Sequence, residues 1–167
     1  MSRGESSIDA VAAAAQDEAL DFAGMSSPDG AVTLLIAESS DVDPGALKDV
    51  VERHDGQVVK SEGGASMCSF ASAHAGLRTA IELQRALASL RIGLHSGFVI
   101  ADAEDFYGRN VVLAARIADH ARPGEILVSG ALREYTSSDP SFEFESRGEQ
   151  HFKGLLGEHP VYSVSWS

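Results

Sequence analysis

Two arginines on one predicted helix are the side chains of this chain best placed for chemistry. The helical pattern opens at Gly108 after an acidic connection, and Arg109 and Arg116 project from it as cations. Taken on its own, this segment is best explained as an ordinary crossover helix, on whose surface Arg116 would pair with Asp119 or Glu125. The alternative is that these cations belong to a functional site, and both interpretations stay open at this level.

Other reactive side chains form weaker patterns. The six histidines show no spacing that is typical of metal ligands. Cys68 lies in an apolar run with no neighbouring cation to lower its pKa, so it is predicted to be a core thiol. Ser66 and Ser129 have no base nearby in the sequence and no elbow motif. The sequence therefore favours neither a zinc site nor a serine or cysteine nucleophile.

The candidate residues are carried by alternating strand-like and helical patterns. An unbroken apolar run over residues 31–37 predicts a central strand that is covered on both faces. Apolar residues at helical spacing predict an amphipathic helix over residues 73–90. Because the two kinds of element alternate without repeats, we expect a mixed α/β sandwich of one sheet flanked by helices. The remaining predictions are helices at 46–53 and 130–135, and strands at 57–60, 65–70, 92–100, 126–128, 142–145, 150–153 and 161–164.

A small unit precedes the central strand. Residues 2–24 predict an Ala-rich helix that Gly24 would end. A helix this small needs something to pack on. It either docks on its own domain or serves as a dimerisation or regulatory arm. We therefore divide the chain into a helical arm and turn at residues 1–30 and a single domain at residues 31–167.

Length, charge and cysteine content exclude several classes of protein. The 167 residues suit one domain with a sizeable core. A formal charge of −12 argues against nucleic acid and anionic membranes as partners, because both need a basic patch. One cysteine allows no internal disulfide, and no apolar run is long enough to cross a bilayer. Without a signal-peptide pattern the chain is predicted to be cytoplasmic, although a segment outside it could tether it elsewhere.

Several segments spread over residues 31–164 carry a resemblance to a known family. They are VTLLIAE, GQVVKSEGGASMCSF, RIGLHSG, DFYGRNVVLAARIA, RPGEILVS, FESRGEQHFKG and HPVYSV. Together they resemble the class III nucleotide cyclase catalytic domain, the adenylate and guanylate cyclase homology domain. The segments come in family order, which is more specific than any single motif. The resemblance implies a ferredoxin-like βαββαβ core, with a central and mostly antiparallel sheet flanked by helices.

Members of this family join the 3′-hydroxyl of a nucleoside triphosphate to its own α-phosphate and release pyrophosphate. The resemblance implies two divalent metals, held by carboxylates at adjacent strand ends. Glu38 stands at the first carboxylate position and is the candidate metal ligand, on a longer arm than the family's aspartate. Gly64 stands at the second position, and the nearest carboxylate is Glu62. By resemblance, therefore, half of the metal site is missing.

The connection between Glu38 and Lys60 is also short. It is roughly eighteen residues shorter than the family pattern, equivalent to about five helical turns. It lacks the IVGFT-like segment whose backbone N–H groups cradle the triphosphate. The resemblance thus implies a domain that has lost most of one helix and part of the nucleotide cleft.

Residues that the family contributes from the other subunit of a dimeric site are largely kept. By resemblance, Lys60 reads the purine and Asp105 pairs with the adenine amino group, which implies adenine over guanine. Arg116 matches the arginine that stabilises the transition state, and Lys153 matches the lysine that binds the triphosphate. Val112 replaces the asparagine that orients the ribose, a loss that should cost catalysis. Alternatively, Lys60 and Asp105 are ordinary surface residues.

Three functions are compatible with these observations. The first, which we favour, is a degenerate cyclase homology domain that dimerises, can bind ATP, and regulates or scaffolds without turnover or cofactor. The second is an active or weakly active adenylate cyclase, which converts ATP to cyclic AMP and pyrophosphate with Mg²⁺ or Mn²⁺. It would use Glu38 with a repositioned acid in a homodimer, or it would be active only as a heterodimer with a metal-competent cyclase domain. The third is a sensor of another small molecule in the remnant cleft.

Overall fold

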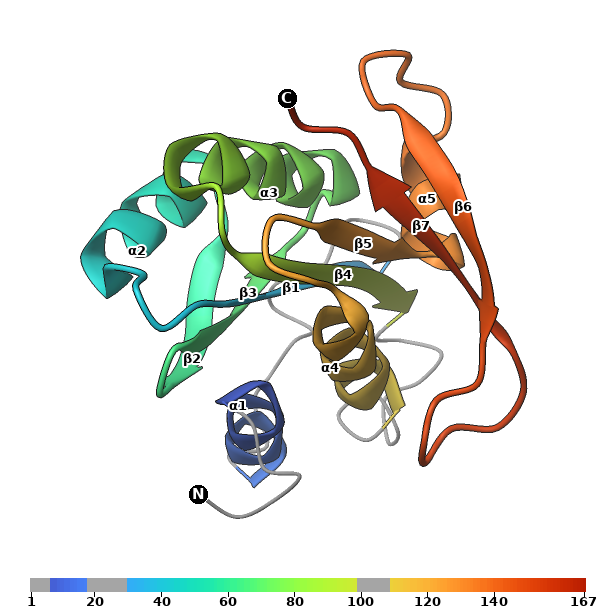
Figure 1. The fold of residues 1–167 in the computed structure, drawn as a ribbon, viewed down its shortest axis with the longest axis horizontal. Helices are drawn as coiled ribbons and strands as arrows, with labels where there is room; N and C mark the ends of the chain where they lie inside the picture. Colours follow the sequence, from blue (N-terminus) through green and yellow to red (C-terminus); the bar gives the residue numbers. More distant parts are fainter. Residues whose placement is uncertain (1–6, 18–29, 99–108) are drawn as a thin grey trace.

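One seven-stranded sheet forms the centre of the domain (Figure 1). The computed structural model describes residues 7–17, 30–98 and 109–167, except the side chains at 16, 17 and 98. Neighbouring strands are antiparallel, apart from the parallel pair β4 and β5. The mixed, mostly antiparallel sheet that the sequence predicts is therefore confirmed. The strand order is β2-β3-β1-β4-β5-β7-β6, with bounds β1 (Ala31–Glu38), β2 (Gln57–Glu62), β3 (Ala65–Phe70), β4 (Arg91–Phe98), β5 (Ile126–Ser129), β6 (Phe144–Gln150) and β7 (His159–Val164).

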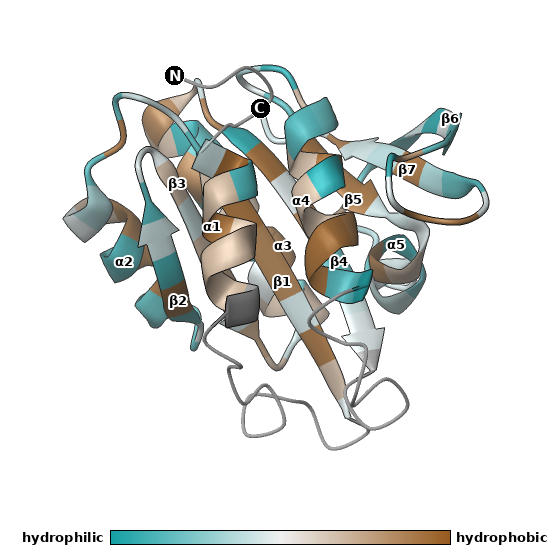
Figure 2. Cartoon of the chain, turned by 90° about the horizontal axis from the view of Figure 1, so that it is seen from below, coloured by the Kyte–Doolittle hydropathy of each residue, from teal (hydrophilic) through white to brown (hydrophobic). Residues whose placement is uncertain are grey.

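Helices cover both faces of this sheet. On one face lie α2 (Pro44–Arg53) and α3 (Ala73–Leu87), together with α5 (Gly130–Thr136), which contacts α3. On the other face α1 (Ser7–Asp17) and α4 (Val111–His120) lie side by side, as Figure 2 shows. The predicted sandwich of one sheet flanked by helices is thus the observed one. None of the described helices has the length and apolar character needed to span a bilayer.

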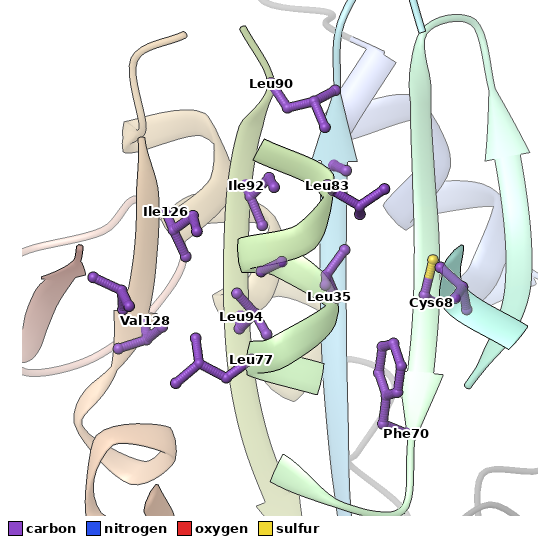
Figure 3. Packing of buried hydrophobic residues seen from close by; sticks show 14 of the residues in the cluster. Leu35, Cys68, Phe70, Leu77, Leu83, Leu90, Ile92, Leu94, Ile126 and Val128 are labelled. Carbon is purple, nitrogen blue, oxygen red and sulfur yellow. The ribbon is translucent and has the colours of Figure 1, made fainter. Parts of the chain in front are cut away.

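The central strand β1 shows why both faces are covered. Leu35 and Ala37 belong to the apolar cluster under α2 and α3, whereas Val32, Leu34 and Ile36 belong to the cluster under α1 and α4. This alternation follows from the two-residue period of a strand. Figure 3 shows Leu35 beneath α3 among the side chains of the first cluster. Each fully buried leucine or isoleucine stabilises the fold by about 2 kcal/mol.

Close packing of α4 on β4 depends on a glycine. A Cβ atom at Gly93 would lie 2.4 Å from Ala118 N and 2.6 Å from Ala118 Cα, which are backbone atoms of α4. A second glycine, Gly97, faces the side chain of Asn110 in the same way, with 2.5 Å from the Cβ position to Oδ1. The short spacing draws the helix, and with it Arg116, down onto the strand.

The helix α3 ends earlier than its apolar pattern predicts. It ends at Leu87, not Leu90, because Ala88 adopts the left-handed conformation with φ of 56°. Leu90 continues the apolar pattern but contributes from the connection to β4. The buried amide of Gln84 replaces the missing helical turn, since its Nε2 donates to Leu90 O at 2.6 Å and to Glu125 O at 3.2 Å.

The terminal hairpin also differs from its prediction. Phe142 precedes the strand and packs on α3, where its ring lies 6.0 Å from His74 and 5.7 Å from the Arg78 guanidinium. The strand β6 begins only at Phe144 and continues to Gln150, so residues 150–153 are not a strand of their own. The predicted boundaries were wrong because β6 lies at the sheet edge and is mostly exposed, which leaves little apolar alternation to mark it.

The same hairpin is tied to the start of β5 by an ion pair. Arg147 Nη1 lies 2.7 Å from Glu125 Oε2, and Arg122 N–H donates to Glu125 Oε1 at 2.8 Å. Burial raises the pKa of the Glu125 carboxyl, but these hydrogen bonds outweigh it and hold the pKa below its ordinary value of 4.5. The folded state therefore favours the charged form.

Glu125→Gln is expected to lower the free energy of unfolding by about 1 kcal/mol at pH 7. Because the pKa is depressed in the folded state, this stabilisation is present above pH 4.5 and is lost as pH falls through the lower folded-state pKa. Urea unfolding of both proteins between pH 7 and pH 3 should show their difference shrink in that window. A difference that is constant over the whole range would contradict the assignment.

Candidate nucleotide site

The candidate residues on β1 and β2 share the face of the sheet that α1 and α4 cover. Glu38 is paired with Ala65 in the β1–β3 register, and Glu62 is paired with the same alanine in the β2–β3 register. Directly paired residues point to one face. Lys60, which pairs with Met67, also lies on this face and is half-buried. The Cα atoms of Glu38 and Glu62 are roughly 10 Å apart across two strand spacings.

Glu38 is half-buried and is engaged by an arginine. Arg91, the first residue of β4, places Nη1 3.4 Å from Glu38 Oε1. The remaining donors of its guanidinium bind the end of α4, with Nη2 to Asp119 O at 2.7 Å and Nε to Ala121 O at 2.9 Å. A surface hollow of about 280 Å³ lies here, lined by Glu38, Ser39, Ser40, Asp41, Ser89, Arg91 and Pro123.

The position of the second carboxylate is closed by backbone. A Cβ atom at Gly64 would lie 2.5 Å from Ser39 O, and Ser39 N–H donates to Gly64 O at 3.0 Å. The short connection after Glu38 thus packs directly against the turn between β2 and β3. Within residues 7–17, 30–98 and 109–167 no group of three or more His, Cys, Asp or Glu side chains could hold a metal ion. The described residues do not fit a two-metal centre.

Arg116 projects from α4 into a cluster of acidic groups. Its Nη1 lies 3.2 Å from Asp9 Oδ1 on α1 and 4.0 Å from Asp119 Oδ2. Its Nε donates to the backbone oxygen of Lys153 at 3.2 Å. The surface pairing with Asp119 that the sequence allowed is present, whereas Glu125 pairs with Arg147 instead.

These contacts join into one ion-pair chain that links four elements. It runs from Glu38 to Arg91, then to Asp119, Arg116 and Asp9, so that carboxylates and guanidinium groups alternate. The link between the two arginines is Asp119, whose Oδ1 lies 3.5 Å from Arg91 Nη2. Arg91, Asp119 and Asp9 were missed as site residues in the sequence. Only Asp119 had a signal there, its helical spacing from Arg116.

Lys153 lies near Arg116 on the connection between β6 and β7. Its side chain is exposed, and the neighbouring Phe152 ring makes an edge contact with His120 of α4 at 6.1 Å. The structure thus brings together the backbone of Lys153 and the guanidinium of Arg116. Val112, at the expected asparagine position, is half-buried on α4. Asp105, the candidate adenine-reading acid, lies outside the described residues, so its place relative to Lys60 stays a prediction.

A buried polar relay stands beside α4. His95 Nδ1 lies 2.8 Å from Ser129 Oγ, and His95 Nε2 lies 2.8 Å from Asn110 Oδ1. Asn110 Oδ1 can only accept, so His95 Nε2–H donates to it, and the neutral imidazole then accepts at Nδ1 from the Ser129 hydroxyl. Ser129 Oγ also accepts from Leu132 N–H. His95 therefore connects β4, β5 and the start of α4. Cys68 is buried in the other cluster, where burial raises the pKa of its thiol to about 12, as suits an unreactive core residue.

The family of the chain follows from its sequence. The model of the adenylate and guanylate cyclase catalytic domain matches residues 27–165. This chain therefore belongs to the class III nucleotide cyclase catalytic domain family. A protein of Rhizobium meliloti (strain 1021) that carries the name adenylate cyclase 3 is 31% identical over 147 residues, which cover 81% of this chain and 24% of the relative.

A second curated relative has a shorter match. A pH-sensitive adenylate cyclase of Mycobacterium tuberculosis (strain CDC 1551 / Oshkosh) is 32% identical over 78 residues, which cover 45% of this chain and 20% of the relative. The chain thus spans about a quarter or less of the length of these two relatives. What the longer proteins do as a whole is not carried over by the match.

Solved structures agree on the fold. The adenylyl cyclase CyaB of Pseudomonas aeruginosa has a TM-score of 0.68 at 17% identity, covering 82% of this chain and 94% of that chain. Adenylate cyclases of Trypanosoma brucei, described in their monomeric state, give 0.69 at 19%, covering 82% and 90%. A guanylyl cyclase domain of Blastocladiella emersonii, described as a non-canonical dimer, gives 0.64 at 16%, covering 81% and 96%. At these identities the likeness shows the fold alone.

Proposed function

We propose that this chain is a degenerate class III cyclase domain that lacks two-metal catalysis and acts as a dimerising, ATP-binding regulatory or scaffolding module. One observation carries the proposal. The single carboxylate at the first metal position, Glu38, is paired with Arg91, and the second position is Gly64, where a side chain would meet Ser39 O at 2.5 Å. A guanidinium paired with the one remaining carboxylate repels Mg²⁺, so the chemistry that lowers the pKa of the 3′-hydroxyl has no support here.

ATP binding is proposed from the cationic side of the site. Arg116 lies beside the backbone of Lys153, and both residues border the edge where α4 meets the terminal hairpin. Arginine and lysine side chains bind phosphate oxygens, and Arg does so through a planar set of donors. Lys60 and Asp105 are proposed to read adenine, on the family resemblance alone. We also propose that the protein is cytoplasmic, because ATP is available there.

A second candidate function is kept because the chain has the cationic residues Arg116 and Lys153 but has glycine at one of the two positions for metal-binding acids, Gly64. In a heterodimer, a metal-competent cyclase domain could supply the carboxylates and the metal ions, and this chain could supply Arg116 and Lys153. Such a pair would make cyclic AMP with Mg²⁺ or Mn²⁺, although the loss of the ribose-orienting asparagine at Val112 would lower its rate. A homodimer of this chain would contain no complete metal site.

The test is cyclic AMP formation by the purified chain with ATP and Mn²⁺. We expect none from the wild type, and none from Gly64→Asp, because the added carboxylate would collide with the Ser39 carbonyl and the connection stays short. Arg116→Ala is the matched control that must also be silent. Product from the wild type that disappears in Arg116→Ala would overturn the degenerate assignment in favour of an adenylate cyclase.

Mixing experiments separate the two candidates. The chain is added to an active cyclase domain, and the rate and oligomeric state of that partner are followed. A changed rate that depends on Arg116 supports the heterodimeric cyclase, and a changed rate that Arg116→Ala keeps supports a regulatory or scaffolding role. ATP that fails to bind to any form of the chain would leave a domain for another ligand.

A further inference from the structure

The helix α1 packs against the sheet face that carries the candidate site. Its apolar side, formed by Ile8, Val11, Ala12 and Ala15, is buried. This side contacts β1, β2, β3 and α4, and it closes the second apolar cluster of the domain. Figure 2 shows the helix lying over the sheet next to α4. The other members of the cluster are Val32, Leu34, Ile36, Ala65, Met67, Val111, Ala114, Ala115 and Ala118.

The polar side of α1 touches both candidate positions of the site. At the cationic position, Asp9 Oδ1 lies 3.2 Å from Arg116 Nη1, and the two side chains are only 29% and 31% exposed. At the position of the missing acid, Gly64 N–H donates to Ser7 Oγ at 3.4 Å. One short helix thus holds a carboxylate against the candidate phosphate-binding arginine and a hydroxyl against the turn between β2 and β3.

A phosphate group would have to compete with these contacts. The guanidinium of Arg116 already serves two carboxylates through Nη1 and the Lys153 carbonyl through Nε. The Asp9 carboxylate beside this guanidinium also repels an incoming phosphate group, so each of the two anions weakens the binding of the other to Arg116. An ion pair this exposed changes the equilibrium between docked and undocked α1 by about five-fold at most. The buried apolar side of α1 supplies the rest of the free energy that holds the helix on the sheet.

We propose that α1 is a built-in inhibitor of the nucleotide site, in which Asp9 occupies Arg116 and must be displaced when a nucleoside triphosphate binds. The inference rests on the proposed function, because it takes Arg116 as a phosphate-binding group. It adds a regulatory role for the helix: whatever draws α1 off the sheet raises nucleotide affinity. The reason is that the fraction of molecules with an undocked α1, which can bind nucleotide, sets the apparent Kd. By linkage, bound nucleotide loosens α1.

A disulfide can hold α1 in place and test this directly. A Cβ atom built on Gly63 lies 3.4 Å from Ser7 Cβ, close to the span of about 3.5–4.5 Å between bridged Cβ atoms. We therefore combine Ser7→Cys with Gly63→Cys. The single variant Gly63→Cys is the control for strain, because Gly63 has a φ of +58°. Cys68 is buried and does not compete for the new bridge.

The measurement is the Kd for ATP with Mg²⁺, by isothermal titration calorimetry. We expect the oxidised double variant to bind at least about ten-fold more weakly than the same protein after reduction. Asp9→Asn, which keeps the shape of the side chain, should bind about two- to five-fold more tightly than the wild type. The gain should vanish when Asp9→Asn is added to Arg116→Ala, since the pair then no longer exists.

Each outcome decides between the two claims. ATP that binds equally to the oxidised, reduced and Asp9→Asn proteins would overturn the inhibitory role of α1 and leave the proposed function in place. A gain from Asp9→Asn that persists with Arg116→Ala would also overturn it, because the carboxylate would then act through something else. ATP that binds to no form, including the reduced and Asp9→Asn proteins, would overturn both the proposed function and the inference.

Discussion

Replacing Gly93 with alanine is expected to lower the free energy of unfolding by about 3 kcal/mol. The added Cβ would lie 2.4 Å from Ala118 N and 2.6 Å from Ala118 Cα. These are backbone atoms inside α4, so no side chain can rotate away to make room. Either the helix or the strand must shift, and overpacking of this kind typically costs about 1–3 kcal/mol or more.

Gly45→Ala is the matched control for this substitution. Gly45 lies in the first turn of α2, and its Cβ would meet only Asp43 Oδ1 at an ordinary 3.6 Å. Alanine there should leave the domain unchanged or stabilise it by up to about 1 kcal/mol, because glycine is the poorer helix former. Urea unfolding followed by circular dichroism compares the three proteins. If Gly93→Ala is as stable as the wild type, α4 does not pack closely on β4.

Arg91→Ala is expected to cost about 2–3 kcal/mol of unfolding free energy. The side chain is about a quarter exposed and binds two backbone carbonyls at the end of α4, as well as Glu38 and Asp119. Its removal leaves two carboxylates near each other without their shared cation, and it leaves the carbonyls of Asp119 and Ala121 without this donor. Hydrogen bonds to a charged group contribute about 1.5–3 kcal/mol each when partners are left unsatisfied.

Two further variants separate geometry from charge in this result. Arg91→Lys keeps the cation but cannot reproduce the planar set of donors, so it should fall between the wild type and Arg91→Ala. Arg78→Ala removes an arginine side chain that is 54% exposed and pairs with Asp139. Its loss should lower the free energy of unfolding by less than about 1 kcal/mol. An Arg91→Ala protein that is no less stable than Arg78→Ala would show that Arg91 does not hold β1, β4 and α4 together.

The ion-pair chain supports the proposal that the metal site is lost. Glu38 retains its carboxylate, but the carboxylate now belongs to a chain of charges that ends at α1. In this arrangement its partner is a fixed guanidinium that also closes the end of α4. The acid is therefore used to hold elements together, and the same chain sets the partner of Arg116.

Much of the fold could be predicted because its signals are local. The unbroken apolar run of β1, the amphipathic spacing of α3 and the glycine pair between β2 and β3 each predict an element without reference to the rest of the chain. The errors came where local signals compete. Leu90 fits the helical period of α3, but the left-handed Ala88 ends the helix before it. The exposed edge strand β6 has too little apolar alternation to locate its ends.

The sequence by itself determined the class of the domain, the order of its elements and the absence of an acid at Gly64, because these depend on residue type and local spacing. Tertiary structure alone decided what the remaining site residues contact. Glu38 meets an arginine 53 positions away, and Arg116 meets an aspartate 107 positions away on a helix that precedes the sheet. Such contacts have no periodicity to reveal them, since they arise only when β1, β4, α4 and α1 pack on one face.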